Sequence, residues 1–131
     1  MRWEEPMRGT WDGRTPRSSD RELVAPRDAL SEGPVRFLLV SGRTDDERWG
    51  LVGAFWLSID GDRGGFLVSP GAVWRGAEMV RSFRRALERG WQAEEVYGYW
   101  QSLTGVAGDV WIDPQHHADT LFQVARRVGC L

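Results

Sequence analysis

Adjacent His116 and His117 are the only histidines of the chain, and two carboxylates, Asp113 and Asp119, flank them in the stretch WIDPQHHAD. Imidazole and carboxylate groups bind metal ions and transfer protons, so this stretch is a candidate metal or acid/base site. Asp113 followed by Pro114 is also a typical helix start, because aspartate caps free N–H groups and proline fits the first turn. The stretch therefore has a structural interpretation beside the chemical one.

A helix over residues 114–128 would separate the two histidines. Adjacent helical residues point about 100° apart, so both rings cannot clasp one ion, and helical metal sites space their histidines four residues apart instead. On this helix His117 shares a row with Leu121 and Val128, which places it on the buried side and His116 toward solvent. We therefore expect no metal site, and His117 alone stays a candidate for acid/base catalysis or ligand contact.

Two further carboxylates, Asp60 and Asp62, lie in the glycine-rich stretch DGDRGG. The pattern begins like a calcium-binding loop, but Gly64 and Gly71 stand at its fifth and twelfth positions, where an EF-hand carries oxygen ligands. The phosphate-binding glycine patterns are absent as well. The stretch predicts a hairpin turn. Asp60 and Asp62 stay candidates for acid/base catalysis, and no cofactor is predicted.

An arginine row lies in the segment 72–91. This segment has five arginines against two glutamates, and Arg81, Arg85 and Arg89 are spaced one helical turn apart. Such a row indicates either a solvated helix face or a contact surface for an acidic partner. The net charge of the whole chain is −2, which argues against nucleic acid as the partner, because that function normally needs a broad basic surface.

Aromatic side chains form another candidate surface. The chain contains 8 tryptophans in 131 residues. Trp56 lies in a predicted strand, while Tyr97, Tyr99 and Trp100 lie close together in a predicted helix over 92–105. Aromatic rings of this kind fill a core, line a ligand pocket or provide the centre of a protein interface. We predict that these four residues, with the arginine row, contact a ligand or partner.

The spacing of apolar residues predicts the strands that position these groups. Three short apolar runs, 35–41, 49–59 and 66–70, are separated by turn-rich segments. They predict a three-stranded antiparallel meander over about residues 35–70. In the second run strict alternation would place Leu51 on the same face as Phe55.

After Pro70 the apolar period becomes helical. It predicts helices over 72–90 and 92–105, a fourth strand over 109–112 and the last helix over 114–128. Because strands and helices are partly segregated along the chain, the predicted class is α+β, with the helices packed on one face of the sheet.

Length and composition set the remaining expectations. Residues 1–33 are charged and rich in Arg, Gly, Ser and Pro, which indicates a flexible or loosely docked arm, followed by a single domain over 34–131. No apolar run is long enough to span a membrane. Cys130 is the only cysteine, which favours a cytoplasmic location. The presence of 17 arginines without lysine indicates a bacterial gene of high GC content.

These features lead to a ranked expectation of function. The first hypothesis is a small cytoplasmic interaction or ligand-binding protein of accessory or immunity type, without catalysis. It would bind an acidic protein partner or a small organic ligand through a Trp/Arg-rich surface, and it is compatible with a homodimer. The alternative is a small cofactor-free enzyme that uses acid/base catalysis in an aromatic pocket. The third hypothesis is a nucleic-acid-associated regulator.

Overall fold

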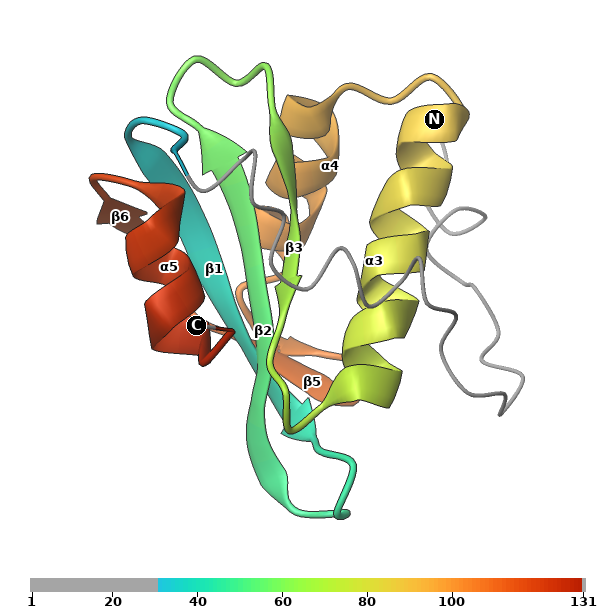
Figure 1. The fold of residues 1–131 in the computed structure, drawn as a ribbon. Helices are drawn as coiled ribbons and strands as arrows, with labels where there is room; N and C mark the ends of the chain where they lie inside the picture. The colour runs from blue at the N-terminus through green and yellow to red at the C-terminus, as the bar shows by residue number, and fades with distance from the viewer. Residues whose placement is uncertain (1–30, 131) are drawn as a thin grey trace.

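The structure, a computed structural model, describes residues 31–130 of the chain. It confirms the predicted α+β class (Figure 1). The predicted arm over 1–33 lies outside the described residues except for its last positions. The elements, in chain order, are β1 (Val35–Arg43), β2 (Trp49–Ser58), β3 (Gly64–Val68), α3 (Val73–Glu88), α4 (Ala93–Ser102), β4 (Gly105–Ala107), β5 (Val110–Ile112), β6 (His116–Ala118) and α5 (Leu121–Val128).

All strands belong to one antiparallel sheet with the order β3-β2-β1-β5-β4, and β6 pairs with β1 as well. The predicted meander is confirmed as β1, β2 and β3. The long strand β1 therefore has β2 along one side and two short strands along the other, β6 at Val35–Phe37 and β5 at Val40 and Ser41. The predicted fourth strand is β5, whereas β4 was not predicted, because its three residues are too few for a periodicity.

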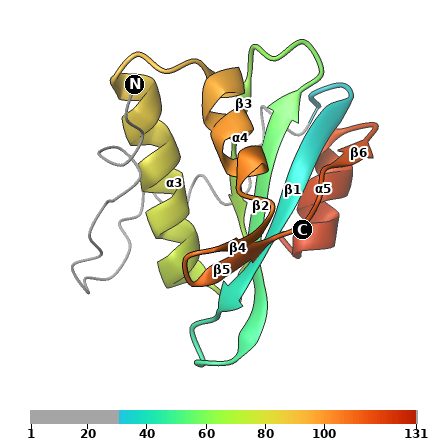
Figure 2. The ribbon, with the colours of Figure 1, turned by 180° about the vertical axis from the view of Figure 1, so that it is seen from behind.

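Helices cover both faces of the sheet (Figures 1 and 2). α3 and α4 pack on one face with Leu38 of β1 and Phe55 of β2, whereas α5 packs on the other with Leu39 and Trp56. The prediction that the helices pack on a single face is therefore wrong for α5. The physical reason is that β1 and β2 carry apolar side chains on both sides, and each side needs a cover.

A β-bulge interrupts the alternation of β2. The register of β1 against β2 shifts between Val40 and Ser41. As a result Val52 joins the core on the α3 side, while Leu51 packs toward α5. The strict alternation that placed Leu51 beside Phe55 fails at the bulge, since a bulge adds one residue to a single strand.

The predicted helix start at Asp113 is also wrong. α5 begins after Thr120, whose side chain accepts a hydrogen bond from the Gln123 N–H at 3.4 Å. Asp113 instead accepts a hydrogen bond from the Trp111 indole N–H at 2.9 Å. His116–Ala118 pair instead with Val35–Phe37 of β1, so backbone pairing overrides the local helix signal of Asp113 and Pro114.

None of the helices within residues 31–130 is long and apolar enough to cross a membrane.

A pair of glycine substitutions tests how closely α3 packs on β3. A Cβ added to Gly76 in α3 would lie 2.3 Å from a methyl group of Val68, whereas a Cβ added to Gly98 in α4 would meet nothing within 4 Å. We expect Gly76→Ala to lower the free energy of unfolding by about 1–3 kcal/mol through overpacking. Gly98→Ala should raise it by about 0.5–1 kcal/mol, because alanine favours the helix. Urea denaturation measures both. Equal effects of the two substitutions would contradict the packing described.

The corrected start of α5 gives a second test. Thr120→Ala removes the side-chain cap and should lower the free energy of unfolding by about 1 kcal/mol. Asp113→Ala should cost less, since its carboxylate caps no helix. If urea denaturation showed the larger loss for Asp113→Ala, the helix would begin where the local sequence signal places it.

Candidate functional site

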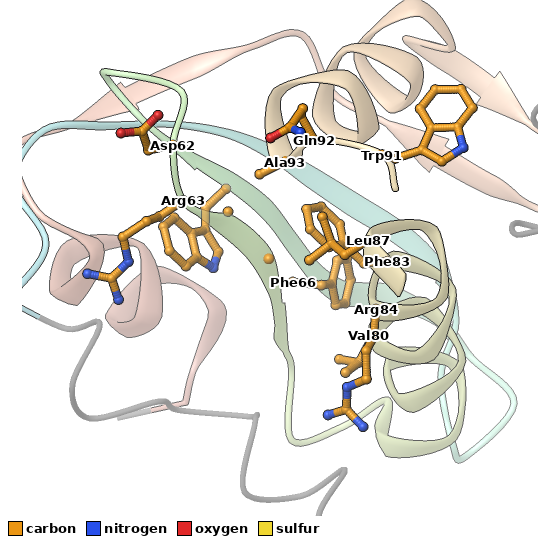
Figure 3. A pocket seen from close by; sticks show the side chains of 13 residues that line it. Asp62, Arg63, Phe66, Val80, Phe83, Arg84, Leu87, Trp91, Gln92 and Ala93 are labelled. Atoms are coloured by element: carbon orange, nitrogen blue, oxygen red, sulfur yellow. The ribbon is translucent and has the colours of Figure 1, made fainter. Parts of the chain in front are cut away.

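A groove of about 470 Å³ opens between β3, the second half of α3 and the start of α4 (Figure 3). This volume lies within the range of small-molecule sites in proteins. We call it the β3 groove. It is lined by Trp56, Asp62, Arg63, Gly64, Gly65, Phe66, Val80, Phe83, Arg84, Leu87, Trp91, Gln92 and Ala93.

The glycine pair at the start of β3 makes the groove. Trp56 belongs to the core on the α5 side, yet it reaches the groove because Gly64 and Gly65 carry no side chains. A Cβ at Gly65 would lie 3.2 Å from the indole nitrogen of Trp56. On the other side of the strand, Phe66 and Phe83 form an apolar wall. The groove therefore extends around the edge of the sheet.

Helix α3 runs antiparallel to β3 and supplies the second wall of the groove. Gly76, near the start of the helix, contacts Val68 at the end of the strand. Leu87, near the end of the helix, lines the groove together with Gly64 at the start of the strand. Leu87 is 40% exposed, so an apolar surface is open to solvent at this end.

Charged groups surround the opening of the groove. Arg63 forms a salt bridge with Glu32 at 2.9 Å. Among residues 31–130 no carboxylate lies within salt-bridge distance of Arg84, which is exposed. Asp62, also exposed, is the one carboxylate that residues 31–130 contribute to the lining. An exposed arginine without a carboxylate partner favours an anionic group on whatever occupies the groove.

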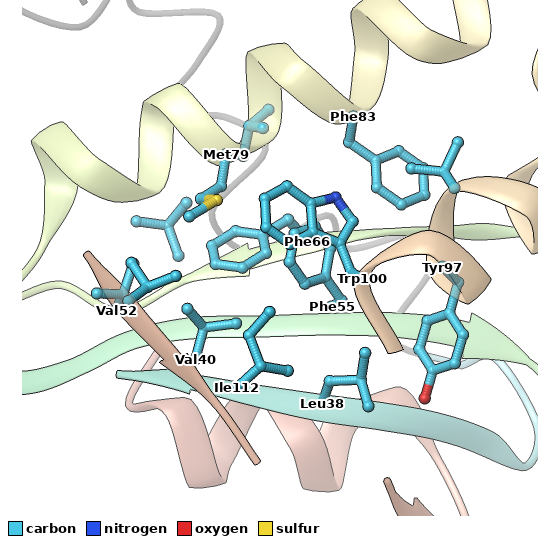
Figure 4. Close-up of a cluster of buried hydrophobic side chains, with 14 of the residues drawn as sticks. Leu38, Val40, Val52, Phe55, Phe66, Met79, Phe83, Tyr97, Trp100 and Ile112 are labelled. Carbon is cyan, nitrogen blue, oxygen red and sulfur yellow. The ribbon is translucent and has the colours of Figure 1, made fainter. Parts of the chain in front are cut away.

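The predicted aromatic contact residues separate into two groups. Trp56 lines the groove, whereas Tyr97 and Trp100 are buried in the core between α4 and the sheet (Figure 4). Trp100 stacks on Phe55 with ring centroids 4.8 Å apart. Tyr99 is half-buried and packs edge-on against Trp100. The helix aromatics predicted as a contact surface therefore hold α4 on the sheet.

Tyr97 has a structural hydrogen bond. Its hydroxyl donates to the side-chain oxygen of Gln115 at 3.0 Å, which ties α4 to the segment before β6. Burial raises the pKa of the Tyr97 hydroxyl well above its usual range. The side chain therefore stays neutral and acts as a donor.

The predicted arginine row does not line the groove. Arg81 and Arg85 are half-buried and Arg89 is exposed after the end of α3. Arg85, in the last turn, lies where a positive charge interacts favourably with the helix dipole. Arg84, next to this row, is the residue that lines the groove.

Asp60, predicted as a candidate acid or base, stabilises the turn between β2 and β3. Its carboxylate accepts hydrogen bonds from the Ser58 hydroxyl at 2.6 Å and the Asp62 N–H at 3.0 Å. The Ser58 hydroxyl in turn accepts from the Arg63 N–H at 3.0 Å. The hydrogen bond from Ser58 lowers the pKa of the Asp60 carboxyl. Asp60 is therefore held ionised by its turn partners.

The structure reverses the expected orientation of the two histidines. In β6 His117 is exposed and pairs with Arg36, whereas His116 is half-buried and stacks on Phe37 with ring centroids 5.4 Å apart. The reversal follows from the strand period of two residues, which replaces the helical period assumed for this stretch. No hydrogen bond or ion pair joins His117 to the carboxylates of the β2–β3 turn in the described chain.

Neither a metal centre nor a reactive thiol emerges from the described residues. Within 31–130 no cluster of three His, Cys, Asp or Glu side chains could hold a metal ion. The Cys130 thiol donates a hydrogen bond to the Val68 carbonyl at 3.0 Å, and burial raises its pKa to about 11. A thiol with a raised pKa is a weak nucleophile.

Sequence reasoning missed most of the groove. Phe66, Phe83, Leu87 and Trp91 follow the ordinary apolar pattern of a strand and helices, so nothing distinguished them from core residues. The available signal was the pair Gly64–Gly65 next to an apolar strand, because glycine in a strand often marks a close backbone approach.

Comparison with known proteins gives no match: no protein-family model, no curated protein and no solved structure resembles the chain.

The turn around Asp60 gives a pH-dependent test. Because its pKa in the folded protein is below the ordinary value of 3.8, its ionised form contributes stability above that pH, and this is lost as the pH falls through the folded pKa. We expect Asp60→Asn to be less stable than the natural protein at neutral pH, with the difference shrinking below 3.8. Urea midpoints across this range measure the effect.

The matched control is Asp62→Asn in the same turn, which should leave the midpoint unchanged. A loss of stability that is constant with pH would contradict the role assigned to the ionised Asp60 carboxylate.

Proposed function

We propose that this protein is a small non-catalytic binding protein, and that its binding site is the β3 groove. The observation that carries the proposal is an open groove with aromatic and aliphatic walls and an arginine at its rim. Apolar walls combined with a few polar groups are typical of ligand-binding clefts. The walls would hold the apolar part of the bound molecule, and Arg84 would select an anionic group.

The arrangement of ionisable groups favours binding over catalysis. His117 is on β6 and Asp60 is engaged in its turn, so neither lines the groove. Asp62 reaches the rim but is exposed to solvent. Acid/base catalysis needs groups within hydrogen-bond reach of one substrate, and the described residues do not bring the predicted candidates together.

The chemistry of the groove suggests two kinds of bound molecule, an acidic segment of a protein partner or a small organic anion with an apolar body. Both present apolar surface to Phe66, Phe83 and Leu87 and a negative group to Arg84. We also infer a cytoplasmic location, because a single cysteine fits a reducing compartment.

A small aromatic anion tests the site. We expect 2-naphthoate to bind the natural protein in calorimetric titrations and Leu87→Asp to lose this binding, because the new carboxylate repels the ligand inside the apolar groove. Phe122→Asp is the matched control, since Phe122 is 45% exposed on α5, close to the 40% of Leu87. Equal loss in both variants, or no binding to the natural protein, would refute the proposed site.

The rim arginine gives a separate test. Arg84→Gln should weaken 2-naphthoate binding about fivefold, which is at the upper end for an exposed ion pair. The effect should diminish at high salt, because salt screens exposed charges. Arg126→Gln on α5 is the control. An unchanged affinity in Arg84→Gln would show that Arg84 does not contribute to binding, and only the apolar walls would then remain as the proposed site.

A further inference from the structure

Strand β3 has a free edge along the β3 groove. Among the strands of residues 31–130, β3 pairs only with β2, which places it at the end of the strand order. The Ser58 N–H donates to the Arg63 carbonyl at 2.7 Å, so at this end the backbone groups of Arg63 face β2. In an antiparallel ladder the facing groups alternate. The N–H and C=O groups of Gly64 and Phe66 therefore point away from β2.

These outward groups have no partner in the part of the chain that the structure describes. Within residues 31–130 no backbone or side-chain hydrogen bond reaches Gly64 or Phe66 on this side. At the far end of the strand the outward carbonyl of Val68 accepts from the Cys130 thiol at 3.0 Å. The free part of the edge is thus the part that borders the groove.

This edge lacks the features that usually prevent strands from pairing with other chains. Natural edge strands carry charged residues, prolines or bulges for that purpose, whereas β3 reads GGFLV. Two glycines at its start let another backbone approach closely. The opposite edge of the sheet, β4, has only three residues.

We propose that the molecule bound in the β3 groove is an extended acidic polypeptide segment of a partner protein, which adds as a further strand to β3. The inference rests on the proposed function and specifies its ligand. Backbone hydrogen bonds to Gly64 and Phe66 provide affinity, and side chains at alternate positions enter the groove against Phe83 and Leu87. An acidic side chain meets Arg84, which has no carboxylate partner among residues 31–130.

Charge favours a different protein over a second copy of this chain. The strand of a second copy would read GGFLV and would bring no carboxylate of its own to Arg84. An acidic partner strand supplies one, and opposite charges across an interface favour that pairing.

The test uses the full chain, labelled with ¹⁵N, and the blocked peptide acetyl-EVTFTVE-amide as probe. At millimolar peptide we expect the amide signals of Gly64 and Phe66 to shift and their hydrogen exchange to slow at least tenfold. The control acetyl-RVTFTVR-amide should bind at least fivefold more weakly. Arg84→Glu should weaken binding of the acidic peptide about fivefold, whereas Arg126→Glu on the other face should not.

Backbone methylation of the peptide distinguishes strand addition from simple burial of side chains. N-methyl groups on one set of alternate amides should weaken binding about tenfold or more, because they remove donors to β3. Methylation of the other set should have little effect. Equal effects of both sets would overturn the proposal.

Three further outcomes would overturn strand addition. They are the absence of peptide-induced shifts, slow exchange of Gly64 and Phe66 already in the free monomer, and protection that appears only when the chain dimerises. If the peptide shifts Phe83 and Leu87 without protecting Gly64 and Phe66, the β3 groove remains a binding site and only strand addition fails. If neither pair responds and 2-naphthoate also fails to bind, the proposed function fails as well.

Discussion

Burial of both faces of β1 and β2 is the constraint on which the rest of the fold depends. Neighbouring residues such as Leu38 and Leu39, or Phe55 and Trp56, send large apolar side chains to opposite sides of the sheet. Removing apolar surface from water on both sides contributes most of the stabilisation, and it requires a helix layer on each face. α3 and α4 form one layer, and α5 forms the other. Between α4 and α5 the chain pairs with β1 as β6, which leads it to the opposite face of the sheet.

The β3 groove follows from how this packing ends at the edge of the sheet. Contact between Gly76 and Val68 holds the start of α3 against the end of β3. At the opposite end β3 begins with two glycines, so the start of the strand places no side chain of its own in the space toward Leu87. Apolar surface and free backbone groups then lie side by side. That combination is the basis for the proposed binding site.

Periodicity in the sequence predicts the long elements and fails for the short ones. The meander and α3 follow from apolar patterns that extend over many residues. β4 and β6 have three residues each. β4 forms by pairing with β5 and β6 by pairing with β1, and the pairing of β6 joins residues that are distant in sequence. The β6 segment also shows why His117 was placed on the wrong side, since Asp113 and Pro114 gave a helix signal that strand pairing overrode. The candidate site was predictable only at Trp56, Asp62 and the glycine pair, because its other walls come together through tertiary packing.

¹⁹F NMR of the protein labelled with 5-fluorotryptophan and titrated with 2-naphthoate tests directly whether the β3 groove is a binding site. Trp56 and Trp91 line the β3 groove, whereas Trp49 and Trp111 are exposed elsewhere. If the groove binds the ligand, the signals of Trp56 and Trp91 move together along one saturable binding curve while those of Trp49 and Trp111 stay in place. Movement of Trp49 or Trp111 without Trp56 and Trp91 would place the binding surface elsewhere and rule out the β3 groove.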